Sequence, residues 1–208
     1  MNNTIPFILA TVFCFCVSIH NAFADSPLTS IDFTNAYSDE PIVQEALLAD
    51  GLLTTSVLQY ITDDAKPIGI KLACIRALGF EVNGKDNYSI LVDYLRKKNN
   101  YPIGNAMLYQ LSADTLICMG YVKALDNYFE VSEALSIARL AKSKAATSYA
   151  IHLLTAMIEA QQLKRPYWCL VYRLAETVRN YPGLKMDLRP EAIDAAFAYM
   201  NLYKKYCD

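Results

Sequence analysis

The chain has 208 residues, of which 54% are hydrophobic, and its 19 basic and 21 acidic side chains give a formal net charge of −2. This length is sufficient for one domain with a sizeable core. Nucleic-acid binding depends on clustered Lys and Arg, so the near-neutral balance argues against a nucleic acid as partner.

The first 24 residues have the pattern of a secretory leader. An apolar run extends from Ile5 to Ile19, and Ala22-Phe23-Ala24 places small residues at the −3 and −1 positions before Asp25. The run is shorter than the roughly 20 apolar residues that span a bilayer. We therefore predict a signal peptide over residues 1–24, cleaved between Ala24 and Asp25, and a periplasmic or secreted protein with no stable membrane anchor after cleavage. The alternative is an uncleaved anchor.

The rest of the chain predicts an all-α fold of about eight to nine helices, because its apolar residues recur three and four apart. Residues 25–37 are expected to be irregular, and residues 38–208 to form a single helical domain. Prolines favour the first turn of a helix, and four of them mark expected starts: Pro41, Pro67, Pro166 and Pro190. The expected helices cover about residues 39–50, 52–61, 67–78, 86–98, 106–125, 132–140, 145–163, 166–180 and 190 onward.

Three of the long helices end in related tetrapeptides: Ile75-Arg76-Ala77-Leu78, Val122-Lys123-Ala124-Leu125 and Ile158-Glu159-Ala160-Gln161. Each is followed by a turn and a second, shorter helix, and the alanine in each lets neighbouring helices approach closely. In repeat length, helix order and small-residue placement, residues 38–208 resemble HEAT- and armadillo-type helical repeat proteins. The resemblance implies an α-solenoid of stacked antiparallel helical hairpins. The alternative is an irregular helical bundle.

Four cysteines lie outside the leader: Cys74, Cys118, Cys169 and Cys207. An even number in an oxidising compartment favours two disulfides, and four cysteines allow three pairings. Neighbouring helices lie about 8–10 Å apart, so we predict the pairs Cys74–Cys118 and Cys169–Cys207 from helix order. The alternative is that some of them are buried free thiols, which are common in apolar cores.

Catalytic chemistry has few candidates. His152 is the one histidine beyond the leader, and its neighbours four residues away along a helix are Ser148 and Ala156. We expect a structural histidine, since no adjacent base–nucleophile pair follows from this spacing. The densest acidic pairs lie at helix starts, where capping and the helix dipole account for them. The sequence therefore predicts no catalytic residue, metal or cofactor, and a protein that is not an enzyme.

Tyrosine is unusually frequent, with 15 Tyr against one Trp. Tyr presents a rigid ring with a polar tip, which suits protein interfaces, although most of these rings are expected to pack in the core or at its edge. The predicted partner-binding residues are Tyr128 and Phe129, in a loop between two predicted helices, and three tyrosines in or beside turns: Tyr101, Tyr109 and Tyr167.

Stacked helical hairpins form extended concave surfaces, which suit the binding of another protein. We therefore predict an exported protein-binding module. The chain is similar in size class and composition to the helical immunity proteins that neutralise cell-wall amidases delivered by type VI secretion, which implies inhibition of a secreted toxin. The alternatives are an envelope assembly or structural protein, and a hydrolase with a cleft between hairpins.

Overall fold

The protein is described by a computed structural model that places residues 26–80, 84–99, 105–163 and 166–207. The structure is 70% helical, and its described part contains no strand beyond one isolated bridge between Ser148 and Lys185. The prediction of an all-α fold is therefore confirmed. The predicted leader and its cleavage position at Ala24 and Asp25 lie outside the described residues.

The described ranges hold ten α-helices and three short 3-10 helices. Their bounds are α1 (Pro27–Ser30), η1 (Thr34–Tyr37), α2 (Pro41–Leu48), α3 (Thr55–Ile61), α4 (Ile68–Ala77), α5 (Asn87–Asn99), η2 (Asn105–Gln110), α6 (Ala113–Asp126), α7 (Ser132–Lys144), α8 (Tyr149–Gln161), α9 (Trp168–Arg179), α10 (Pro190–Met200) and η3 (Asn201–Tyr206).

Two long helices begin later than their apolar periodicity predicted, because a serine caps each one. The predicted helix over residues 106–125 is divided into η2 and α6, where the Ser112 side chain accepts a hydrogen bond from the backbone N–H of Thr115. The predicted helix over 145–163 begins at Tyr149, where Ser148 accepts from the N–H of Ile151. In both cases the cap, and not the apolar pattern, fixes the helix start.

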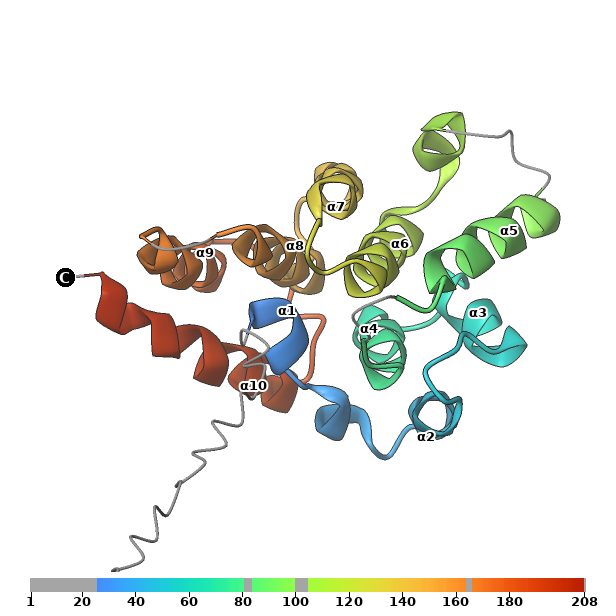
Figure 1. The fold of residues 1–208 in the computed structure, drawn as a ribbon, viewed down its shortest axis with the longest axis horizontal. Coiled ribbons are helices and arrows are strands. Elements are labelled where there is room, and N and C mark those ends of the chain that lie inside the picture. The colour runs from blue at the N-terminus through green and yellow to red at the C-terminus, as the bar shows by residue number, and fades with distance from the viewer. Residues whose placement is uncertain (1–25, 81–83, 100–104, 164–165, 208) are drawn as a thin grey trace, which may run out of the picture.

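The first helices of the predicted hairpins, α4, α6 and α8, lie in sequence against one another (Figure 1). The second helices lie on this row: α5 packs on α6, α7 lies between α6 and α8, and α9 packs on α8. Of the three repeated alanines, Ala124 and Ala160 are buried and Ala77 is half-buried.

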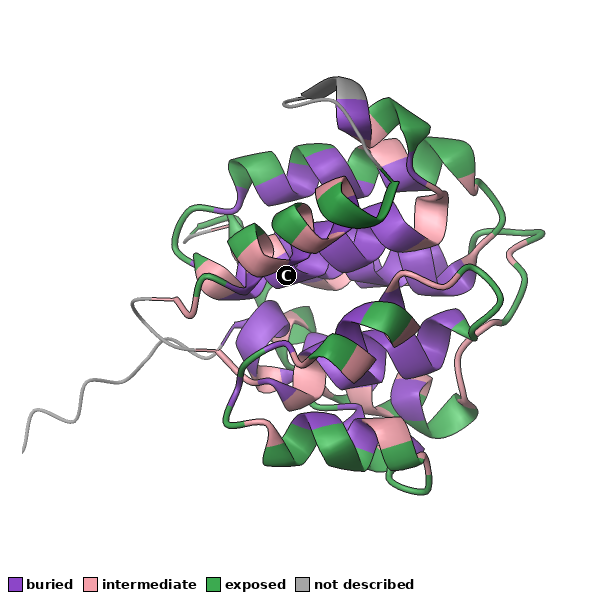
Figure 2. Cartoon of the chain, turned by 90° about the vertical axis from the view of Figure 1, so that its right-hand side faces the viewer, coloured by how far each residue is buried: buried purple, intermediate pink, exposed green. Residues whose placement is uncertain are grey.

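Helices α6 and α8 form the centre of the core. Most residues of both are buried, including the small or polar Gly120, Thr115 and Thr155, and Figure 2 shows the buried interior in purple. A helix that is apolar on all sides is stable only when other elements cover it completely. The remaining helices therefore have to be arranged around these two.

The expectation that residues 25–37 are irregular is wrong for the described part of that segment. Residues 27–30 form α1 and residues 34–37 form η1, and α1 contacts α6, α8 and α10 on the side of the row away from α7 (Figure 1). Leu28 and Ile31 are almost completely buried, and the Arg76 guanidinium donates hydrogen bonds to the carbonyls of Thr29 and Ile31 at 3.0 and 2.8 Å. A four-residue helix is too short to show an apolar period, so periodicity did not reveal it.

The last described helices complete the same side. Helix α10 packs on α1, η1 and α9, and Arg189 at its start forms ion pairs with Asp39 and Glu40. The Arg189 backbone N–H also donates to the hydroxyl of Tyr37 at 2.9 Å. These contacts connect the beginning and end of the described chain.

We predict that Leu28→Ala destabilises the protein by about 2–5 kcal/mol, because it leaves a cavity between α1 and the central helices. The matched control is Leu48→Ala, since Leu48 is 86% exposed and its loss should change the free energy of unfolding by less than about 0.5 kcal/mol. Urea unfolding followed by circular dichroism measures both. Equal effects for the two variants would show that α1 is not part of the core.

Candidate functional site: the α7 ridge and its two hollows

Helix α7 lies close against α6 because small residues line the contact between them. Ala134, Ala138 and Ala141 are buried against α6 and α8. Gly120 of α6 faces them, and a Cβ atom at this position would lie 3.2 Å from the Ala134 carbonyl oxygen and 3.3 Å from the Ala138 nitrogen. Small residues on both sides bring the two backbones close together.

The outward face of α7 is exposed and polar. It carries the exposed residues Ser132, Glu133, Ser136, Arg139, Lys142, Ser143 and Lys144. Figure 1 shows α7 standing between α6 and η2 on one side and α8 and α9 on the other. We call this helix, with the hollow on each of its sides, the α7 ridge.

The first hollow, the α5–α7 hollow, has a volume of about 380 Å³. Its lining comes from α5, η2 and α7: Tyr88, Leu108, Tyr109, Glu133, Ser136, Ile137 and Leu140. The lining is mixed, with aromatic and aliphatic side chains beside one carboxylate and one hydroxyl.

Lys123 organises the floor of the α5–α7 hollow. Its ammonium lies 2.7 Å from the Glu133 carboxylate and 4.2 Å from the centre of the Tyr88 ring. The hydrogen bond from Lys123 lowers the pKa of Glu133, so this carboxylate is charged at neutral pH. On the outer rim, the Lys144 ammonium donates to the carbonyls of Tyr109 and Leu111 at 2.8 Å each, which attaches η2 to α7.

The second hollow, the α7–α9 hollow, has a volume of about 430 Å³. Residues from α7, α8, α9 and the following turn line it: Arg139, Lys142, Ser143, Ala146, His152, Thr177, Val178 and Tyr181. Both charged side chains in this lining are cationic. Arg139 forms an exposed ion pair with Glu159 at 3.0 Å, and no ion pair to Lys142 is formed within the described residues.

His152 lies in the α7–α9 hollow with its ring centre 5.5 Å from that of Tyr181. The side chain is buried, and its Nε2 atom has no hydrogen-bond partner among the described residues. Burial, followed by the positive charge of Lys142, lowers the pKa of His152 below its usual value. The imidazole is therefore neutral at neutral pH.

Ser148 and Asp187 are close to one another, but they serve the start of α8. The Ser148 hydroxyl donates to the Asp187 carboxylate at 2.6 Å, and the same carboxylate accepts the backbone N–H of Ala150 at 2.7 Å. The Ser148 hydroxyl therefore bonds to Asp187 and not to the His152 ring four residues later, because Ser148 is the N-cap of α8.

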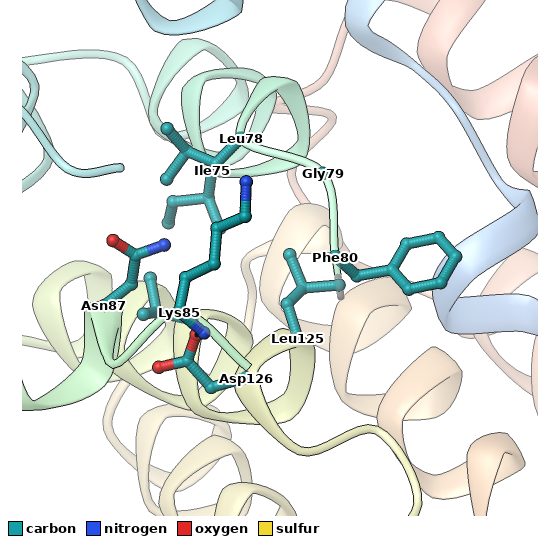
Figure 3. Close-up of a pocket in the computed structure, with 9 residues that line it drawn as sticks. Ile75, Leu78, Gly79, Phe80, Lys85, Asn87, Leu125 and Asp126 are labelled. Atoms are coloured by element: carbon teal, nitrogen blue, oxygen red, sulfur yellow. Dashed lines mark hydrogen bonds between the residues drawn. The ribbon is translucent and has the colours of Figure 1, made fainter. Parts of the chain in front are cut away.

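A third, much smaller cavity lies between α4, α5 and α6 (Figure 3). Its volume is about 10 Å³, which is room for about one water molecule and no larger ligand. The polar side chains around it support the backbone: Asn87 accepts from the N–H of Leu53 and donates to the carbonyl of Gly51, and Asp126 accepts from the N–H of Tyr88. This cluster connects loops and is not a candidate binding site.

The predicted partner-binding aromatics have different outcomes. Tyr109 and Phe129 are 70% and 69% exposed, and Tyr109 lies on the rim of the α5–α7 hollow. Tyr167 is 60% exposed but stands just before α9, and it does not line either hollow. Tyr101 lies outside the described residues.

The prediction that Tyr128 faces a partner is wrong, because its ring is 5% exposed. It packs edge-on against Phe80, with ring centres 5.2 Å apart, and lies beside Phe129. Position in a loop does not determine which of two adjacent aromatics turns inward. Sequence reasoning also missed Lys142, Arg139 and Tyr181, which come together only when α7, α8 and α9 pack.

The predicted Cys169–Cys207 disulfide is present and joins α9 to the end of η3, with Cα atoms 4.7 Å apart. The predicted Cys74–Cys118 bridge is wrong, because both residues are free, buried thiols. Their helices α4 and α6 do touch, but helix contact alone does not bring two Cα atoms within the roughly 4.4–6.8 Å of a disulfide. Burial raises the pKa of Cys74 to about 12 and that of Cys118 further, so neither is a reactive thiolate.

Among the described residues, no cluster of three or more His, Cys, Asp or Glu side chains is arranged to hold a metal ion. No helix in the same ranges has the length and apolar character needed to cross a bilayer. Comparison of the chain with known proteins found no matching family, no matching characterised protein and no matching solved structure.

We predict one disulfide and two free thiols among Cys74, Cys118, Cys169 and Cys207. Peptide mapping without reduction, after alkylation in denaturant, should find Cys169 linked to Cys207 and alkylated Cys74 and Cys118. Replacing both bridged residues with serine should lower the free energy of unfolding by about 2–4 kcal/mol, because the bridge closes a loop between residues 38 positions apart. A Cys74–Cys118 peptide would contradict the structure.

Proposed function

We propose that this chain is an exported protein that binds another protein through the α7 ridge. The observation that carries the proposal is the exposed helix α7 between two open hollows of about 380 and 430 Å³. Hollows of this size accept large side chains of a partner, and a raised helix between them fits a groove in that partner.

The opposite side of the helix row supports this choice of surface. On that side α1 contacts both α6 and α8, α10 packs on α1, and η1 packs on α4 and α10. A partner there would have to displace Leu28 and Ile31 from the core. The α7 side requires no such rearrangement.

The side chains of the ridge have the composition of a binding surface. Exposed Tyr109 and half-buried Leu108 and Leu140 supply apolar area on one side, while Arg139 and Tyr181 lie on the other. Tyr and Arg are the residues most often found to dominate binding energy at protein interfaces. The exposed Ser136 and Glu133 between them provide a polar rim.

Within this class we favour an immunity protein that occludes a secreted toxin, such as a cell-wall amidase. The support is the predicted leader and the similarity in size and composition to helical immunity proteins of type VI secretion, together with an exposed surface suited to covering another protein. An envelope assembly factor that uses the same surface is the other outcome of the experiments below.

The first prediction concerns the side chains of the ridge. After a partner has been isolated with the tagged chain from the cell envelope and identified by mass spectrometry, Tyr109→Ala should weaken its binding by about 2 kcal/mol, or roughly thirtyfold in Kd, because the variant loses an exposed aromatic anchor. Tyr167→Ala is the matched control, because it removes an equally exposed ring away from both hollows. Isothermal titration calorimetry measures both variants. A loss with Tyr167→Ala alone would place the contact surface elsewhere.

The second prediction concerns the kind of partner. A toxin partner should be encoded in a reading frame adjacent to that of this chain, and the purified chain should inhibit its hydrolysis of peptidoglycan at a 1:1 molar ratio. Cells that express the toxin in the periplasm should survive only when this chain is co-expressed. A partner without hydrolytic activity would favour the assembly role and contradict the immunity role.

A further inference from the structure

We infer that the α7–α9 hollow is a carboxylate-binding pocket that receives an acidic side chain of the partner protein. This inference rests on the proposed function and adds the chemistry of one contact to it. Its lining includes the cations Arg139 and Lys142 together with buried His152 and exposed Tyr181.

The charge of the hollow favours an anion. Arg139 and Lys142 are separated by one turn of α7, so both side chains emerge toward the same side. Lys142 is exposed and makes no ion pair within the described residues, and nothing acidic lines the hollow. A carboxylate that enters the hollow can therefore pair with Lys142 without displacing another carboxylate from it.

The nearby acidic groups are occupied elsewhere. Glu159 pairs with Arg139 outside the lining, in a contact whose side chains are 58% and 36% exposed. Such exposed pairs contribute little, so Arg139 can share its remaining N–H donors with a ligand. Asp187 is held by the Ser148 hydroxyl and the N–H of Ala150 at the start of α8.

His152 supplies the second, independent observation. It is 94% buried, since its relative exposure is 6%, and yet its Nε2 atom has no partner. This atom has almost no accessible surface, so a ligand in the hollow does not bond to it directly. The ring still lines the hollow, and a carboxylate beside it favours the protonated imidazole through its negative charge.

The groups that surround His152 are consistent with this behaviour. Lys142 from α7 disfavours the imidazolium, and Asp187 from the loop before α10 favours it. A negative charge beside Lys142 cancels the unfavourable influence, so ligand binding and protonation of His152 support one another. Tyr181, which is 51% exposed, has its hydroxyl available to hydrogen-bond the same ligand.

The experiment follows the imidazole of His152 by NMR in the purified full chain, where His20 is the one other histidine. The probe is the capped peptide acetyl-Gly-Gly-Glu-Gly-Gly-amide, and the control peptide carries Gln in place of Glu. We expect the Glu peptide to shift the His152 C2 proton saturably in the millimolar range and to raise the pKa of His152, and the Gln peptide to do neither.

Two variants and one control locate the contact. Lys142→Gln and Arg139→Gln should each weaken binding of the Glu peptide by tenfold or more. Lys97→Gln removes an exposed lysine on α5, away from the hollow, and should leave binding unchanged. Equal shifts with the Glu and Gln peptides, or unchanged binding by Lys142→Gln, would overturn the pocket.

A titration with sodium acetate tests whether the ligand is an acidic side chain or a free small acid. Acetate binding as tight as that of the Glu peptide would contradict an acidic side chain as the ligand and indicate a free small acid. The peptide experiment needs no partner protein, so it separates the two proposals. If the Glu peptide does not bind but partner binding still depends on Tyr109, only the carboxylate pocket is contradicted. If the Glu peptide binds but no partner binding depends on Tyr109, only the proposed function is contradicted.

Discussion

The arrangement of the whole molecule depends on the need to cover α6 and α8 on every side. Ten of the 14 residues of α6 and 11 of the 13 residues of α8 are buried, among them Tyr121 and Leu154. A single layer of neighbours does not satisfy that requirement. The second helices of the hairpins pack on one side, while α1 contacts both helices on the other and α10 packs on α1.

This requirement also decides which surface remains open. The terminal elements α1 and α10 occupy one side of the row, and Arg189 and Arg76 attach them to the rest of the fold. On the other side, the small residues Gly120, Ala134 and Ala138 let α7 lie close to α6. The α5–α7 hollow separates α7 from α5 and η2, and the α7–α9 hollow separates it from α9.

The sequence predicted most helices well, because apolar spacing and prolines are local signals, although the serine caps that start α6 and α8 were missed. It was less successful wherever the outcome depended on contacts between distant segments. Tyr128 and Phe129 are adjacent and similar, yet only the packing of Phe80 decides that Tyr128 turns inward. Cys169 and Cys207 were paired correctly from helix order, whereas the same reasoning failed for Cys74 and Cys118, because touching helices do not guarantee facing side chains. The α7–α9 hollow could not be predicted, since its lining comes from three helices and a turn.

The most direct test of the α7 ridge as a protein-binding surface is site-specific photocrosslinking in cells that produce the chain. Benzoylphenylalanine is placed at Ser136, on the exposed face of α7, and at Leu48, which is equally accessible at the end of α2. Our account predicts a discrete adduct with one exported protein from position 136 and none from position 48. An adduct from position 48 with none from position 136 would contradict it.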